Sequence, residues 1–229
     1  MEHEITSRPS YAMVDISLDR GEQILAESGA MVSHSDGIEM ETNATGGFLK
    51  SLRRGLFGGE SFFQNTFTAN EPGSVAFAPP LPGDMVHHQL EDDTVYVQSG
   101  SYIASGLELD VDTEFGGART FFGSEGLFLL RISGRGSLFM ASYGAIEEVE
   151  IDPGKTYTVD TGHIVAFEDT ADFTVKRVGG LKSTLLSGEG LVAEFHGSGR
   201  IWLQTRSQDS LLAWLLPKIP NQSQGGPSG

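Results

Sequence analysis

The chain has 229 residues, with 31 Asp or Glu against 15 Lys or Arg, which gives a formal net charge of −16 at pH 7. This acidity argues against binding to nucleic acid or to an anionic membrane surface, because both need Lys and Arg to neutralise phosphates. A strongly acidic surface is one strategy of salt-adapted proteins, and we interpret the chain as that of a halophilic archaeon. Cysteine is absent, which excludes disulfides, thiolate zinc sites and cysteine nucleophiles.

Residues 1–9 form a polar N-terminal arm that lacks the apolar centre of a signal peptide. No apolar stretch approaches the ~20 residues of a membrane-spanning helix. We therefore expect a cytoplasmic protein without a transmembrane segment.

A short pattern occurs three times along the chain. Glu27-Ser28-Gly29 is echoed by Gln98-Ser99-Gly100 and by Asp160-Thr161-Gly162, and each is followed by a Gly-Gly pair. An acidic residue then precedes an apolar run; these acids are Glu60, Glu125 and Glu189, spaced by 65 and 64 residues. A steady period of this kind predicts structural repeats, and units this small bury too little surface to be stable alone. We predict one fused body of three repeats, residues 10–81, 82–142 and 143–206.

Each repeat shows alternation of apolar and polar residues, which predicts strands with one buried face. The predicted strands are, in chain order, residues 14–18, 23–27, 38–42, 62–67, 74–78, 94–98, 107–112, 127–132, 137–141, 146–151, 156–160, 173–176, 191–195 and 200–204. Turn-forming residues separate them at 19–21, 72–73, 91–93, 134–136, 152–154 and 197–199. With 30 glycines, the chain favours an all-β class: three tandem β-sandwich-like repeats in a pseudo-threefold arrangement, with a short C-terminal helix.

A basic insertion at residues 48–57 interrupts the first repeat. It carries charged and apolar side chains together: Lys50, Arg53, Arg54, Leu56 and Phe57. We weigh a solvated loop evenly against a contact for another copy of the chain or another acidic partner.

A second interruption is the predicted helix within residues 207–220. Asp209 or Ser210 could cap it and Pro217 would end it. Its interaction candidates are Leu212, Trp214 and Leu215. Packing against its own body or a neighbouring subunit is favoured over shallow membrane attachment, because Lys218 is the only basic residue beside it. Residues 221–229 are polar and rich in Gly and Ser, which predicts a disordered tail.

Several longer strings resemble signatures of the altered-inheritance-of-mitochondria 24 family. They are Gly58-Gly59-Glu60-Ser61-Phe62-Phe63, Gly123-Ser124-Glu125-Gly126-Leu127-Phe128, Gly144-Ala145-Ile146-Glu147-Glu148, residues 160–167 and residues 178–183, and the resemblance extends over roughly residues 21–219. It implies small β-sandwich units like that of the tryptophan RNA-binding attenuation protein, and assembly into trimers. Mitochondrial relatives are linked to inner-membrane organisation. The resemblance implies no reaction, ligand or cofactor, and the fold name does not imply RNA binding.

The histidines and repeated acids are the remaining candidates for chemistry. His87 and His88 would point to opposite faces of a strand, which disfavours a shared metal. For His163, a histidine hydrogen-bonded to backbone is favoured over a ligand or catalytic role. Glu60, Glu125 and Glu189 could converge on a cation, although bonds to backbone amides in their glycine-rich turns are favoured.

No nucleophile elbow, phosphate-binding loop or dinucleotide fingerprint is present in the sequence. We therefore expect a non-enzymatic assembly or scaffold protein that is homo-oligomeric, with a trimer as the implied state, and that uses no cofactor and binds no nucleic acid. The alternative is a small-ligand-binding or metal-binding β-sandwich protein with a site near His163 or the three acids.

Overall fold

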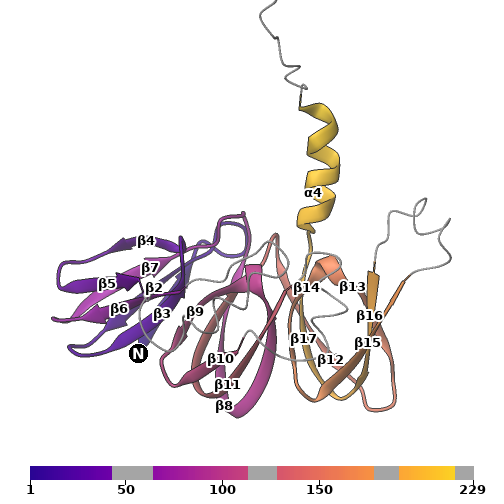
Figure 1. Cartoon of the computed structure of the whole chain (residues 1–229), viewed down its shortest axis with the longest axis horizontal. Coiled ribbons are helices and arrows are strands. Elements are labelled where there is room, and N and C mark those ends of the chain that lie inside the picture. The colour runs from indigo at the N-terminus through magenta and orange to yellow at the C-terminus, as the bar shows by residue number, and fades with distance from the viewer. Residues whose placement is uncertain (43–63, 113–127, 178–190, 220–229) are drawn as a thin grey trace, which may run out of the picture.

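The computed structural model describes residues 1–42, 64–112, 128–177 and 191–219. These residues are mostly β-strand, with one short α-helix, so the predicted all-β class is confirmed (Figure 1). The strands are β1 (Glu2–Thr6), β2 (Met13–Leu18), β3 (Gln23–Glu27), β4 (Met31–His34), β5 (Ile38–Thr42), β6 (Gln64–Ala69), β7 (Gly73–Phe77), β8 (Met85–Gln98), β9 (Tyr102–Gly106), β10 (Leu109–Asp112), β11 (Leu129–Ala141), β12 (Ile146–Ile151), β13 (Tyr157–Asp160), β14 (Ile164–Glu168), β15 (Ala171–Arg177), β16 (Leu191–Gly197) and β17 (Gly199–Gln204). The helix α4 (Gln208–Leu215) follows them.

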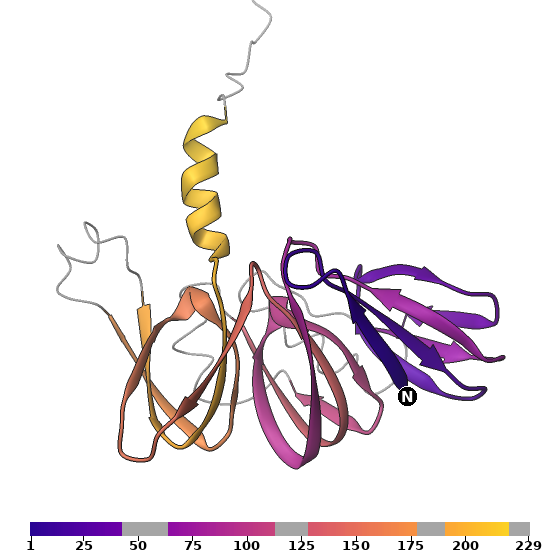
Figure 2. The ribbon, with the colours of Figure 1, turned by 180° about the vertical axis from the view of Figure 1, so that it is seen from behind.

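Three groups of strands lie in a row along the long axis of the molecule (Figures 1 and 2). We call them unit 1 (β1–β7), unit 2 (β8–β11) and unit 3 (β12–β17). The buried apolar side chains form three clusters, one centred on each unit. The alternation seen in the sequence accounts for this, because every second side chain of a strand faces the same side.

One antiparallel pairing scheme occurs in all three units. Each unit has two sets of three paired strand segments. The first set is β2–β7–β4 in unit 1, residues 85–90 and 136–141 with β9 in unit 2, and β12–β17–β14 in unit 3. The second set is β3–β6–β5 in unit 1, residues 94–98 and 129–133 with β10 in unit 2, and β13–β16–β15 in unit 3. We call residues that hold the same place in this scheme counterparts.

Neighbouring units are joined by backbone pairing between one strand of each. Strand β9 of unit 2 pairs with β3 of unit 1, with Ala104 opposite Ala26. Strand β14 of unit 3 pairs with β8 of unit 2, with Ala166 opposite Val97. The cores are also shared, since the first cluster includes Ile103 and Phe139 of unit 2 and the second includes Val165 and Trp202 of unit 3.

Two predicted turns in the second repeat are wrong. Strand β8 runs through residues 91–93 and β11 runs through residues 134–136. The turn-forming residues instead make a bulge, where the register shifts between Gly134 and Arg135. Asp92 and Gly134 take positive φ angles of 69° and 120° at this point. Residues that tolerate that geometry can therefore bend a long strand without ending it.

Four strands were missed by the sequence analysis. Strand β1 lies in the predicted N-terminal arm and pairs with β2. Strands β4, β9 and β14 each follow one of the repeated Ser-Gly or Thr-Gly pairs. Their short apolar runs show too little alternation to identify a half-buried strand, and β9 and β14 are buried almost throughout.

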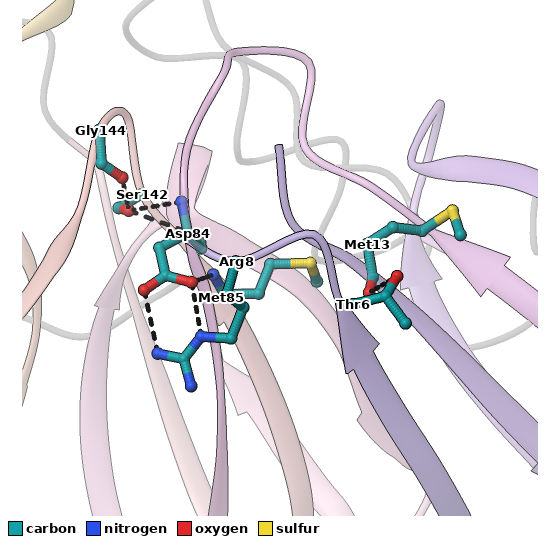
Figure 3. A network of polar contacts seen from close by, with 7 residues as sticks. All are labelled: Thr6, Arg8, Met13, Asp84, Met85, Ser142 and Gly144. Atoms are coloured by element: carbon teal, nitrogen blue, oxygen red, sulfur yellow. Dashed lines mark hydrogen bonds and ion pairs between the residues drawn. The ribbon is translucent and has the colours of Figure 1, made fainter. Parts of the chain in front are cut away.

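A polar network ties the N-terminal segment to unit 2 (Figure 3). Arg8 donates through Nε and Nη2 to the Asp84 carboxylate, at 2.7 and 2.9 Å. The Asp84 side chain is 4% exposed and also accepts from the Met85 amide at 2.9 Å. The Ser142 hydroxyl donates to the Gly144 carbonyl at 2.6 Å, on the segment that leads into unit 3. The Asp84 carboxylate thus binds both the Arg8 guanidinium and a backbone amide, and it connects the N-terminal segment to the start of β8.

Replacing Arg8 tests this contact. Arg8→Gln leaves a nearly buried carboxylate without its cation, and we expect the free energy of unfolding to fall by about 2 kcal/mol in denaturant titrations. The double variant Arg8→Gln/Asp84→Asn should recover part of that loss, because the buried charge is gone. Lys155→Gln is the control, since it removes an ion pair with Asp152 in which both side chains are exposed. Equal effects of Arg8→Gln and Lys155→Gln would contradict the importance of the network.

Candidate interaction surfaces

Several predicted site residues lie outside the part of the chain that the structure describes. They are the insertion residues Lys50, Arg53, Arg54, Leu56 and Phe57, and the repeated acids Glu60, Glu125 and Glu189. The predictions of a basic contact loop and of a shared cation site therefore stay predictions.

The C-terminal helix carries the three remaining interaction candidates. It extends away from the β units (Figures 1 and 2). Leu212, Trp214 and Leu215 are exposed, with Trp214 at 60%. Lys218 Nζ lies 4.5 Å from the centre of the Trp214 ring. A short helix with apolar residues in water is expected to need a partner surface for stability.

The start of this helix differs from the prediction. Ser207, and neither Asp209 nor Ser210, is the N-cap, and its side chain accepts from the Ser210 amide. Ser207 has extended backbone angles, as a cap residue requires, and Asp209 falls in the first turn, where a negative charge is favourable. The predicted end holds, because α4 stops at Leu215 and a 3-10 turn containing Pro217 follows. Within the described residues, every helix falls short of the length and apolar character needed to cross a bilayer.

Strand β4 forms a second exposed apolar surface. Among the described residues it pairs with β7 alone, whereas its counterparts β9 and β14 each pair on both edges. Val32 is 53% exposed, while its counterparts Ile103 and Val165 are both at 0%. An unpaired edge bearing apolar side chains is a ready template for another strand.

Strand β13 shows the same difference at the opposite end of the molecule. In the described ranges it pairs with β16 alone, whereas its counterparts β3 and residues 94–98 pair on both edges. Tyr157 is 39% exposed, while its counterparts Ile24 and Val95 are at 0%. Units 1 and 3 thus each have one open strand edge among the described residues. In unit 2, the corresponding edges are both paired with a neighbouring unit.

Sequence reasoning missed both edges. Each repeated glycine is followed, two residues later, by an apolar pair: Met31-Val32, Tyr102-Ile103 and Ile164-Val165. The first pair is exposed and the other two are buried, which depends on the unit that lies beside each pair. The available signal was the position of the repeat in the chain, because the first and last repeats of an array each lack one neighbour.

The His163 side chain is hydrogen-bonded to the backbone. Its Nδ1 donates to the backbone carbonyl of Gln204 at 2.7 Å. The Gln204 amide in turn donates to the Gly162 carbonyl at 2.9 Å and accepts from the Tyr143 amide at 2.9 Å. These bonds fix the turn between β13 and β14, which is the role favoured from the sequence.

His87 and His88 point to opposite sides of β8, as expected. The His87 ring lies 4.2 Å from that of His3 and 5.0 Å from that of Phe139, while His88 packs on Trp202 at 5.0 Å. Neither Nε2 has a hydrogen-bond partner among the described residues. Those residues also contain no group of three or more His, Asp and Glu that could hold a metal ion.

Both histidines are kept neutral by their surroundings. Burial, followed by the nearby His3 and His88, lowers the pKa of His87 to about 4. Burial, followed by the charge of Arg200, also lowers the pKa of His88. Such shifts fit packing between units, where an imidazolium would lose its hydration.

The His87 shift predicts a pH dependence of stability. Because its folded pKa lies below the unfolded value of 6.5, the unfolded chain binds more protons between these values. The contribution of neutral His87 to the free energy of unfolding is therefore fully present above pH ~6.5 and is lost as the pH falls towards ~4. His87→Phe keeps a ring against Phe139 and should weaken the pH dependence of the thermal midpoint over this window. His196→Phe should not, because the His196 ring lies in an exposed contact with Thr156. Parallel curves for wild type and His87→Phe would contradict the assignment.

Comparison with known proteins places the chain in a family. An uncharacterized protein of Streptococcus pyogenes serotype M6 is 26% identical over 231 residues, which is 97% of this chain and 93% of that protein. The X-ray crystal structure of protein SPYM3_0169 from Streptococcus pyogenes superposes with a TM-score of 0.79 at 26% identity, covering 95% of this chain and 99% of that one. The family model described as Mitochondrial biogenesis AIM24 matches residues 3–206, the β units without α4. This chain belongs to that family, as its repeated strings indicated.

Proposed function

We propose that this protein is a non-enzymatic assembly module that binds further copies of itself. The observation that carries the proposal is the exposure of Val32 on β4, at a place where Ile103 and Val165 are fully buried. Burying a side chain of this size contributes about 2 kcal/mol. A surface that two units bury inside the chain is therefore expected to be buried in the third by another chain.

The proposal includes a common origin for the three units. The recurring pairing scheme and the register shift that β4, β9 and β14 share support three copies of one repeat. The pseudo-threefold arrangement and the trimer are the finer parts of this proposal, and they rest on the sequence pattern and the family resemblance.

The mass in solution tests self-assembly. Light scattering in molar salt, which screens the charge of −16, should give a multiple of the 24.6 kDa chain. Val32→Lys places a charge on the β4 edge and should reduce the mass to one chain. Met40→Lys is the control, because Met40 is also exposed and lies on β5. A wild-type mass of one chain would overturn the proposal, and so would dissociation by both substitutions.

We propose α4 as a second contact between copies. Its exposed Leu212 and Trp214 lie beyond the residues that the family model matches. Deleting residues 210–219 should lower the mass or shift the association midpoint to higher protein concentration. An unchanged mass and midpoint would remove α4 from the assembly and leave β4 as its contact. The thermal midpoint of the truncated chain serves as the control for folding.

A further inference from the structure

We infer that β4 of one copy pairs with β13 of the next copy as antiparallel strands, with Ser33 opposite Val159 and His34 opposite Thr158. This inference rests on the proposed function and names the partner surface of the same site. The occupant of the open β4 edge is a second copy of this chain, because the chain itself contains two examples of the junction.

The first step is to place β4 among its counterparts. Strand β4 pairs with β7, β9 pairs with β11, and β14 pairs with β17. Each pairing skips one residue, which is Val32, Ile103 or Val165, and resumes at the next one. That position is Ser33, Ala104 and Ala166, opposite Ala76, Phe139 and Trp202. Ser33 is therefore the counterpart of Ala104 and Ala166.

The second step places β13 in the same way. The residue before each 3-10 turn or Ser-Gly turn is Glu27, Gln98 or Asp160. Gln98 and Asp160 have nearly identical backbone angles, with φ of −63° and −62°. Counting back from them, Val159 is the counterpart of Ala26 and Val97.

The third step transfers the register. Within the chain, Ala104 lies opposite Ala26, and Ala166 lies opposite Val97. The same pairing between two copies puts Ser33 opposite Val159. One residue further on, the pairs Ser105–Leu25 and Phe167–Tyr96 translate to His34 opposite Thr158. Because the side-chain period of a strand is two, a slip of one residue would reverse which side chains are buried.

The two edges also carry the right side chains for this junction. Val32 and Tyr157 are the exposed members of sets whose other members are fully buried. They lie on units at opposite ends of the row, so one copy cannot satisfy both edges with its own strands (Figure 1). The contact is therefore head-to-tail, and repeating it gives a closed ring or an open filament.

Cysteine cross-linking tests the register, and the chain offers a clean background because it has no cysteine. A chain with His34→Cys is mixed with a chain with Thr158→Cys and oxidised mildly. Directly opposite residues lie within disulfide reach, whereas residues two places apart along the strand do not. We expect the mixed disulfide dimer as the main product on non-reducing gels. Thr156→Cys, two residues away, replaces Thr158→Cys in the control and should give several-fold less.

The outcomes separate the two proposals. If the mixture has the mass of an oligomer but forms no mixed disulfide, or the Thr156→Cys control links equally well, the β4–β13 register is overturned while self-assembly stands. Efficient linking of His34→Cys to itself would show β4 paired with β4 and would also overturn it. If light scattering gives a single-chain mass for the wild type and both variants, self-assembly is overturned as well.

Discussion

Backbone pairing between units is the interaction on which the rest of the molecule depends. Strands β9 and β14 each complete the edge of the preceding unit, and the same strands bring Ile103 and Val165 into the neighbouring cores. Buried backbone groups need partners and a unit of this size buries too little surface to be stable alone, so pairing between units stabilises both neighbours. Unit 2 has neighbours on both sides. Units 1 and 3 have one each, and this difference explains why Val32 on β4 and Tyr157 on β13 are exposed.

The net charge of −16 makes association of copies unfavourable at low salt. The two edges are suited to overcome that repulsion, because they offer backbone hydrogen bonds and apolar side chains. Residues 31–33 carry no charge. Within the chain, Ala166 and Val97 lie opposite each other at the junction of units 2 and 3, and both are apolar and buried. Head-to-tail pairing therefore extends an interaction that the chain already uses twice.

The sequence predicted the all-β class and many strands because these depend on local pattern. Residues 23–27 and 38–42 form strands with the predicted bounds, and Ile24 and Ala26 of the first are buried, whereas Met40 of the second is exposed. The long strands β8 and β11 were misjudged, because Asp92 and Gly134 suit a turn and a bulge equally well. The exposed edges could not be found locally, since Met31-Val32 resembles its buried counterparts. Exposure there depends on which strands lie beside β4, and a local sequence pattern does not contain that information.

Function was less accessible than fold. The histidines that attracted attention as ligands serve packing and backbone bonding, as the contacts of His87 with Phe139 and of His163 with Gln204 show. The surfaces that distinguish one unit from another, such as Val32 on β4, depend on which strands pair beside them, and a local sequence pattern does not contain that information.

Amide hydrogen exchange along β4 and β13 tests the central claim most directly. In the assembled protein, the amides of residues 32–34 and 157–159 should exchange as slowly as those of β9 and β14, because all would lie in strands paired on both edges. Dilution to the single chain should speed exchange in β4 and β13 together and leave β9 and β14 protected. Fast exchange of β4 and β13 in a protein that light scattering shows to be assembled would contradict pairing between these edges.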